Sequence, residues 1–481
     1  MKSKKFNYSL VLLLLLIITM PSCSNEPAME EAMDKATEAY VGFTLKMPGR
    51  TLGEGAATRY DEGNYHEVGS YQGDDVVSRV DLYLLDAAGT LVESKRFSGT
   101  EMVWTFEGDV QVIQPREPIS TTPGDKYALV IINSPRPLIT ESPSDDYALS
   151  VSNEFPLSGF GGFTDFDDKG TMKRIFKGML SGKSNLTTIT AGVTADDVKA
   201  GQNHIAVSTK RLVSRVIVTK SPNLDANSAA LGTFTDIQYS VAQGSKHIYL
   251  MPYVVNNEYL TPGYDYVADD NYIRTSADSY CYEDLHTPTD VLENPATGGM
   301  GFTAIEGKFL LENTHATYQK GNTAYVLVRA KFTPKKDAIA DGGTLAADGT
   351  FYVGGTDGLI YSSMAAATDP TTGVANQKVA TYTAGKVLYY AWINPDDVTN
   401  PVNAPVMRNN IYHININSFK TLGVNWNPLT PDINNPDPEP DGGNEPPSPI
   451  KPEDPLSSVD TYMAVDVTVE NWTVHSHDID F

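Results

Sequence analysis

The segment YVGFTLKMPGRTLGEGAATRY, residues 40–60, contains two features that the rest of the chain has to explain. Four large apolar residues alternate with small or polar ones, which is the pattern of a strand with one buried face. They are Val41, Phe43, Leu45 and Met47. The residues that follow are rich in Gly and Ala and include Arg50 and Arg59, a composition typical of an exposed, protease-sensitive connection. The segment therefore predicts a core strand followed directly by a cleavable loop.

A second strand of the same kind is predicted at the C-terminus, in TYMAVDVTVENWTVHSHDIDF, residues 461–481. Its alternating apolar residues are Met463, Val465, Val467 and Val469. Trp472 and Val474 have the opposite parity, which predicts a β-bulge near Glu470 and Asn471. Residues 427–458, which precede this strand, are so rich in Pro, Asp, Glu and Gly that we expect an extended tether there.

The N-terminus has the composition of an export signal. Lys2, Lys4 and Lys5 precede an apolar run at residues 10–18 that is too short to span a bilayer as a helix. The run is followed by Met20-Pro21-Ser22-Cys23, which resembles a bacterial lipobox and predicts that Cys23 becomes a lipidated first residue. The alternative is ordinary signal cleavage beside an incidental cysteine. If Cys23 is acylated, no internal disulfide can form, because Cys281 is the only other cysteine.

The charge balance argues against one large class of function. The chain has 36 basic and 60 acidic residues among 481, a formal net charge of −24, whereas proteins that bind nucleic acid present basic surfaces to phosphates. No second apolar run is long enough to cross a membrane as a helix. We therefore expect an acidic, exported protein whose membrane attachment, if any, is the lipid.

Most of the chain reads as strands separated by turn residues, with few and short helical segments. The strands are predicted at residues 79–86, 127–133, 211–220, 235–243, 324–332, 386–394 and 410–419, and a helical turn or two at 195–200 and 276–285. Their number and spacing indicate an all-β protein of two β-sandwich domains in tandem, divided near Ser221.

Four segments carry a resemblance to a known family. They are residues 307–336, 385–395, 405–432 and the terminal MAVDVTVENWTVHSHDIDF; YHEVG at 65–69 and TDIQYSVAQG at 235–244 match in addition. These segments resemble the shaft subunits of the minor fimbriae of Bacteroidales, which are fimbrillins of the type V pilin class. The resemblance implies two Greek-key, transthyretin-like sandwiches, and it implies no cofactor and no enzymatic activity.

The resemblance also implies a life cycle for the chain. A lipoprotein precursor would be anchored to the outer membrane until an arginine-specific protease removes a propeptide whose strand fills the protein's own sandwich. The C-terminal strand of another copy would then take its place. The implied partners are copies of the chain itself, that protease, and fimbrial anchor and tip proteins. The implied division is a signal peptide at 1–22, a propeptide at 23–59, sandwiches at 60–221 and 222–426, the tether at 427–458 and a donor strand at 459–481.

Physical reasoning makes such an exchange sensible. A sandwich that loses a strand exposes unpaired backbone groups and an apolar groove, which accept another strand of matching pattern. Because donor and acceptor surfaces differ, the contact would repeat head to tail into an open filament. Arg59, in the more flexible stretch, is the preferred cleavage position and Arg50 the alternative; solvated arginines with no processing are the simpler interpretation of both.

Other chemistry has little support in the sequence. There is no GxSxG, P-loop, HExxH or CxxC motif, and the one close histidine pair, His475 and His477, is more simply two exposed positions near a chain end. Paired aspartates keep a calcium-binding loop as an alternative to solvated turns. We expect Arg408 at the entry of a strand to have a structural role through hydrogen bonds to backbone groups. The rival functions are a glycan-binding surface lipoprotein and a fimbrial tip component.

Overall fold

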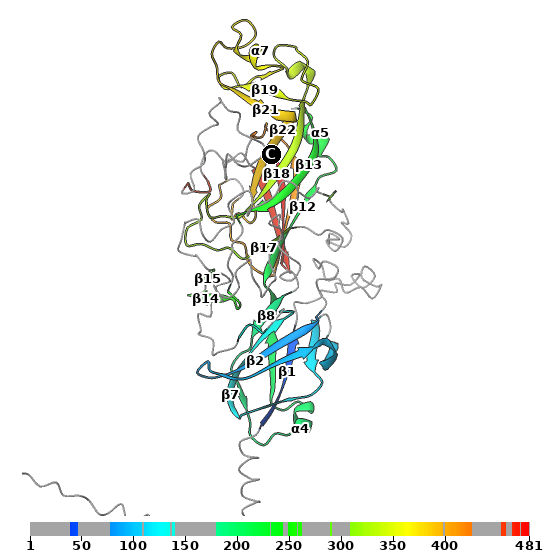
Figure 1. Cartoon of the computed structure of the whole chain (residues 1–481), viewed down its shortest axis with the longest axis vertical. Helices are drawn as coiled ribbons and strands as arrows, with labels where there is room; N and C mark the ends of the chain where they lie inside the picture. Colours follow the sequence, from blue (N-terminus) through cyan, green and yellow to red (C-terminus); the bar gives the residue numbers. More distant parts are fainter. Residues whose placement is uncertain are drawn as a thin grey trace, which may run out of the picture.

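The computed structural model describes residues 39–46, 77–107, 110–134, 137–139, 179–230, 232–243, 249–256, 258–261, 289–290, 308–397, 400–425, 454–457, 464–471 and 473–480. Within these residues nearly all regular structure is β, and the elements form an elongated molecule with two groups of sheets (Figure 1). The prediction of an all-β fold is confirmed. None of the helices in these ranges is long and apolar enough to cross a membrane.

The N-terminal group contains two sheets. The first has the order β10 (His204–Ser208), β1 (Ala39–Lys46), β5 (Val110–Pro115) and β4 (Met102–Glu107), with β6 (Ile119–Thr121) also beside β1. The second has the order β11 (Lys210–Arg211), β8 (Leu180–Lys183), β7 (Gly124–Ile132), β2 (Arg79–Asp86) and β3 (Leu91–Ser98), with β9 (Thr187–Ile189) beside β7. Residues from both sheets share one apolar core, so the pair forms a sandwich.

The C-terminal group is built in the same way. One sheet has the order β16 (Thr289–Asp290), β12 (Val213–Lys220), β23 (Asn410–Ser418), β25 (Thr473–Asp480) and β24 (Ala464–Asn471), with β17 (Lys308–Leu311) also beside β12. The facing sheet has the order β13 (Gly232–Ala242), β18 (Tyr325–Pro334) and β22 (Lys386–Trp392). Inward-facing residues of the two sheets form the largest core cluster of the described chain.

Smaller elements complete the fold. They are the ribbons β14 (Tyr253–Val255) with β15 (Glu258–Leu260) and β20 (Ile360–Tyr361), β19 (Phe351–Gly354) and β21 (Val379–Tyr382), the helices α4 (Ala195–Lys199), α5 (Leu224–Ser228) and α7 (Met364–Thr368), and the 3₁₀ turns η2 (Gly99–Glu101), η6 (Lys336–Ala338) and η7 (Thr383–Gly385).

The seven predicted strands are all present, most of them shifted at an end by one to three residues, and the helical turn predicted at 195–200 is α4. The predicted strand at 211–220 is divided, because β11 pairs with β8 of the N-terminal group whereas β12 pairs with β17 and β23 of the C-terminal group. The change of sheet therefore falls at Leu212, one strand earlier than the division expected at Ser221. The helical turn predicted at 276–285 lies outside the described residues.

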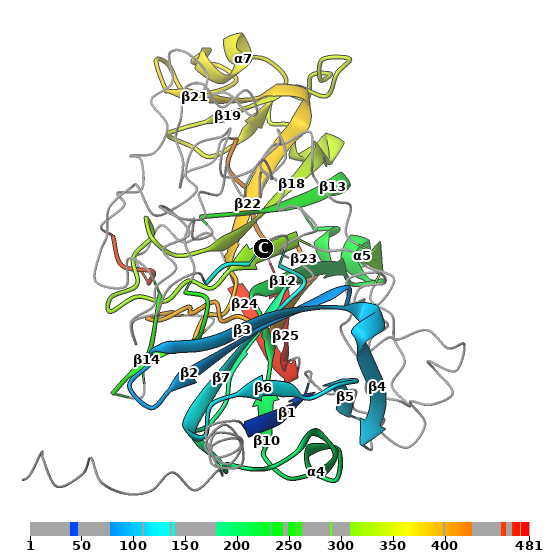
Figure 2. The ribbon, with the colours of Figure 1, turned by 60° about the horizontal axis from the view of Figure 1, so that its bottom comes forward.

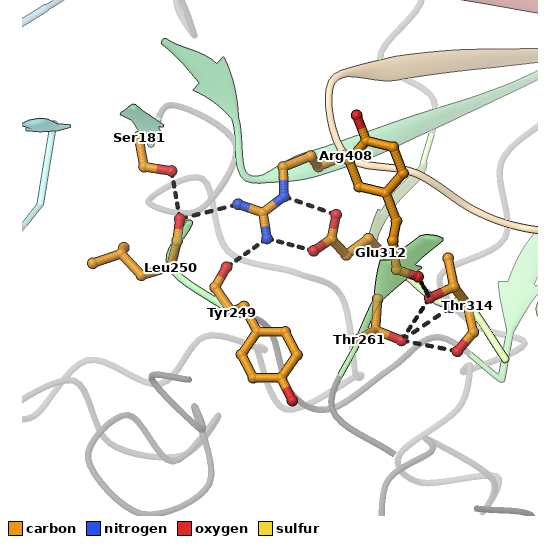
Figure 3. Close-up of polar contacts among 8 residues, drawn as sticks. Ser181, Tyr249, Leu250, Thr261, Glu312, Thr314 and Arg408 are labelled. Carbon is orange, nitrogen blue, oxygen red and sulfur yellow. Dashed lines mark hydrogen bonds and ion pairs between the residues drawn. The ribbon is translucent and has the colours of Figure 1, made fainter. Parts of the chain in front are cut away.

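A buried polar cluster holds the two groups of sheets together (Figure 3). Arg408, just ahead of β23, forms a two-pronged ion pair with Glu312, and both side chains are 2% exposed. Its Nη1 donates to the backbone carbonyl of Leu250 at 3.0 Å, and Nη2, which also binds Glu312, donates to that of Tyr249 at 2.5 Å. The carbonyl of Leu250 also accepts from Ser181 Oγ on β8, at 2.5 Å. The cluster thus joins both sandwiches, and the structural role expected for Arg408 is confirmed.

Apolar packing surrounds this cluster. Tyr83, Leu129 and Ile131 on the outer face of the β2–β7 sheet belong to one buried cluster with Phe309 and Leu311 of β17. Asn409, in the left-handed backbone region with φ of 63°, adds a polar link because its side-chain oxygen accepts from the amide of Arg211 at 3.1 Å. Apolar burial and fixed polar geometry together indicate that the two sandwiches move as one unit.

The expected tether contains a docked segment. Residues Asp454–Ser457 lie against the C-terminal sandwich, where Pro455 bridges to Gln319 and the amide of Lys320 donates to the carbonyl of Asp454 at 2.9 Å. Leu456 is 1% exposed, in a cluster of aromatic residues on the outer face of β18 and β22. A free tether through residue 458 was the wrong expectation for these four residues, because one leucine among prolines finds an apolar site.

Replacing Arg408 by Met should lower the free energy of unfolding by about 3–5 kcal/mol, since the Glu312 carboxylate would stay buried without its partner. A second substitution, Glu312→Leu, should recover part of that loss because it removes the orphaned charge. Urea titration of the two variants against the wild type measures both effects. A single variant as stable as the double variant would contradict the assignment of Arg408 and Glu312 as a coupled buried pair.

Replacing Leu456 by Ser should release the docked segment. Cleavage by an aspartate-specific protease on the amino side of Asp454 should then become several-fold faster, because proteases bind substrates as locally unfolded chain. Mass spectrometry of timed digests would identify the cut. Leu359→Ser, at a leucine that is 49% exposed, is the matched control and should leave the rate unchanged.

Candidate functional site

Strand β1 lies inside a sheet rather than at its edge (Figure 2). On one side it runs parallel to β10, with Gly42 opposite His204 and Leu45 opposite Val207. On the other side it is antiparallel to β6, through Ala39 to Val41, and to β5, through Leu45 and Lys46. The segment closest to the N-terminus among the described residues thus connects strands that come more than sixty positions later in the sequence.

The apolar face of β1 is part of the sandwich core. Val41, Phe43 and Leu45 are each no more than 1% exposed, and the ring centroid of Phe43 lies 5.5 Å from that of Phe97 on β3. Burial of large apolar side chains contributes about 1.5–3 kcal/mol each. The alternation seen in the sequence is therefore confirmed for these three residues; Met47, the fourth, lies outside the described residues.

Polar groups clamp both ends of β1. Asn203 donates from its side-chain nitrogen to the carbonyl of Tyr40 at 3.0 Å, and its own carbonyl accepts from the amide of Gly42 at 3.0 Å. At the other end the amide of Thr209 donates to the carbonyl of Lys46 at 2.9 Å. Loss of β1 would leave these groups and the neighbouring ladders without partners, which costs free energy wherever they stay dry.

The outer face of β1 contacts a small cluster of polar side chains. Thr44 Oγ1 accepts from Gln114 Nε2 at 3.1 Å and contacts His204 Nε2. Burial lowers the pKa of the His204 imidazole from its ordinary value, because the charged form is harder to solvate there. We did not anticipate Asn203, His204 or Gln114 from the sequence, since a polar residue on a strand carries no sign of its cross-strand neighbour.

A short helix supports the same face. Thr194 caps α4, and Thr194 and Asp197 exchange side-chain and backbone hydrogen bonds, with Asp197 Oδ2 accepting from the Thr194 amide at 2.9 Å. This capping box explains why so short a segment is helical. The single buried residue of the helix is Val198, which it presents to Gly42 of β1.

The C-terminal strand is paired within its own chain. β24 forms an antiparallel hairpin with β25, and β25 runs parallel to β23 at the edge of the C-terminal sheet. Asn471 pairs with Thr473, so the chain reverses there. The β-bulge expected near Glu470 and Asn471 was wrong: the change of parity in the sequence marks the end of one strand and the start of another.

Several predicted site residues lie outside the described residues: Cys23, Arg50, Arg59, Met463 and Trp472. Val465, Val467 and Val469 fall on β24, as the alternation predicted. Among the described residues no group of three or more His, Cys, Asp or Glu side chains is arranged to hold a metal ion.

Sequence comparison shows which proteins the chain resembles. Residues 380–478 match the model described as "Major fimbrial subunit protein type IV, Fimbrillin, C-terminal". The chain is also 28% identical to the minor fimbrium subunit Mfa1 of Porphyromonas gingivalis, in an alignment that covers 99% of this chain and all of the relative. The chain is therefore similar to fimbrillins, through the family model at its C-terminal end and through this relative over nearly its whole length. The resemblance seen in the four sequence segments is thereby confirmed.

Solved structures that resemble this protein include a putative cell adhesion protein of Parabacteroides distasonis, with 11% identity and a TM-score of 0.39 over 78% of this chain and 86% of the other. Another is the tip fimbrial protein Mfa3 of Porphyromonas gingivalis, with 11% identity and a TM-score of 0.30 over 77% and 92%. The relative that aligns over the whole chain is described as a minor fimbrium subunit.

The lowered pKa of His204 predicts how acid affects the protein. Below the ordinary pKa of about 6.5 the unfolded chain binds a proton at this residue more readily than the folded chain, so stability falls as the pH drops through that value. His204→Gln should remove this part of the pH dependence while keeping a polar partner for Thr44. Urea midpoints at pH 7.5 and 5.5 measure it; equal acid losses in both proteins would contradict the prediction.

Proposed function

We propose that this protein is a structural subunit of a fimbrial shaft, exported as a lipoprotein precursor and activated by arginine-specific proteolysis. Cys23 carries the lipid, and cleavage after Arg59, or alternatively after Arg50, separates β1 from the rest of the chain. The C-terminal strand of another copy then fills the position that β1 leaves. The mature protein is located in a cell-surface fimbrium together with anchor and tip proteins.

One observation supports this proposal most strongly: β1 is an interior strand contributed by a segment that precedes two arginines. An interior strand is hard to lose, because both its backbone edges and its apolar face are satisfied. Cleavage alone would therefore leave β1 in place, held by ladders on both sides. A replacing strand has to supply the same hydrogen bonds and the same apolar face, and β24 has the required alternation.

The paired state of the C-terminal hairpin is consistent with a precursor that stays monomeric. β24 is paired with β25, and β25 is paired with β23. Both the acceptor position and the donor strand are thus filled within one chain. Exchange between copies replaces one set of ladders by an equivalent set, so it is slow until a cut lets β1 leave.

A reversible lock on β1 tests the proposal. Tyr40 and Ser120 are paired across β1 and β6, at a spacing that a disulfide can bridge. In the leaderless precursor with Cys281→Ser, Tyr40→Cys and Ser120→Cys would tie β1 to β6. An arginine-specific protease should then cut the oxidised protein without producing polymers, and added reductant should start polymerisation in the same sample.

Mass analysis identifies the cut, and electrophoretic ladders with negative-stain microscopy report the polymer. Arg50→Ala and Arg59→Ala, made singly, decide which arginine is used. Equal polymerisation of the oxidised and reduced protein would exclude departure of β1 as the activating step. A protein that is cut and reduced yet stays monomeric would instead favour a tip or glycan-binding role.

A further inference from the structure

Gly42 occupies a position on β1 where a methyl group fits only if the side chains of Val198 and His204 shift slightly, and where a larger side chain needs a larger shift. A Cβ atom built there would lie 2.9 Å from His204 Nδ1 and 2.9 Å from Val198 Cγ1, closer than real Cβ contacts. The φ angle of Gly42 is not in the left-handed region, so the restriction is space rather than backbone conformation. The neighbours are well fixed, since His204 belongs to β10 and Val198 is buried under the capped helix α4.

Any strand that replaces β1 meets the same restriction. Its apolar residues must face the core at the positions of Val41, Phe43 and Leu45, which sets the parity. The residue at the position of Gly42 then faces His204 and Val198 and must be small. The site therefore distinguishes registers that apolar alternation alone would leave equivalent.

The C-terminal segment matches β1 position by position in one register. YVGFTLKM at 40–47 and YMAVDVTV at 462–469 share a tyrosine at the first place, apolar residues at the second, fourth, sixth and eighth, and a small residue at the third. The small residue is Ala464, where β24 begins. A shift by two residues keeps the parity but brings Tyr462 or Asp466 to the position of Gly42.

Strand direction is also constrained. If the segment entered antiparallel to β1 with Ala464 at the position of Gly42, the places of Phe43 and Leu45 would go to Met463 and Thr461. Parallel entry gives those places to Val465 and Val467. Because the parallel arrangement buries more apolar surface, the incoming strand keeps the direction of β1.

The neighbouring outward position fits as well. In this register Asp466 takes the place of Thr44, beside Gln114 Nε2 and His204 Nε2. A carboxylate only accepts hydrogen bonds, and it can accept from both of these nitrogens. Gln114 and His204 would thus keep a partner after the exchange.

We propose that the restricted space at Gly42 sets the register of subunit assembly, and that Ala464 of a second copy takes the place of Gly42. This inference rests on the proposed strand exchange and adds the register and the direction of the donor strand. Ala464 is then a specificity-determining residue, and Val198 and His204 form the surface that selects it.

Substitutions at Ala464 in the full-length, leaderless precursor test the inference. After cleavage, Ala464→Gly should polymerise at least as well as the wild type, whereas Ala464→Val should polymerise about ten-fold more slowly or worse, because of overpacking against Val198 and His204. Valine favours strands more than alanine does, so a loss cannot come from strand propensity. Thr468→Val is the control, because position 468 corresponds to the exposed Lys46.

A compensating change in the acceptor makes the test specific. Val198→Ala removes one of the two atoms that a Cβ at this position would meet. The double variant Ala464→Val with Val198→Ala should regain most of the wild-type rate, measured by light scattering and by ladders on gels. Thermal melting of each uncut variant checks that the precursor remains folded.

The outcomes separate the two proposals. If the wild type polymerises and loses this ability when residues 461–481 are deleted, while Ala464→Val behaves as the wild type, strand exchange stands and the register inference is overturned. If deletion of residues 461–481 has no effect on polymerisation, strand exchange itself fails and the register inference with it. Slow polymerisation of Ala464→Val that Val198→Ala restores would support both.

Discussion

The N-terminal sandwich depends on backbone continuity through β1. Its sheet has β10 on one side of β1 and β5 and β6 on the other, so the hydrogen-bond ladders of three strands meet on this single segment. The core depends on it equally, because Phe43 packs against Phe97 of the facing sheet. A strand in this position is normally secured by covalent connection to its neighbours. Here the connection on one side runs through residues that include Arg50 and Arg59, so the proposed cleavage would remove the covalent attachment of the most central strand of the domain.

The junction between the two sandwiches is rigidly built. Arg408 and Glu312 form a buried ion pair whose remaining donors hold the carbonyls of Tyr249 and Leu250, and Ser181 reaches the same place from the N-terminal sandwich. A buried ion pair is a costly way to gain stability, but it is selective about geometry, because misplacement leaves a charge without a partner. Force applied along the long axis of the molecule would therefore pass through a junction that resists bending.

Local patterns predicted the strands well and their partners poorly. Alternation located β1, β2 and β24 because a half-buried strand must repeat every two residues. The position of Arg408 before a strand was enough to indicate its structural role. The parallel pairings of β1 with β10 and of β12 with β23 join residues far apart in the sequence, and no local pattern encodes them. The same limit explains the misplaced domain division, the misread parity change at Asn471 and the unforeseen contact between Gly42 and Val198: each depends on a neighbour that only the fold supplies.

The docking of Leu456 has a mechanical consequence. With that side chain buried, the long proline-rich stretch before it adds nothing to the reach of the C-terminal strand, which is fixed by the chain between Ser457 and Ala464. At about 3.3–3.6 Å per residue, the chain from Ser457 to Ala464 can span at most about 25 Å. In the proposed exchange the C-terminal strand could therefore pair only with a subunit in direct contact. Copies joined in this way would form a stiff filament with a fixed repeat. Releasing Leu456 would lengthen the connection between copies and make the filament flexible.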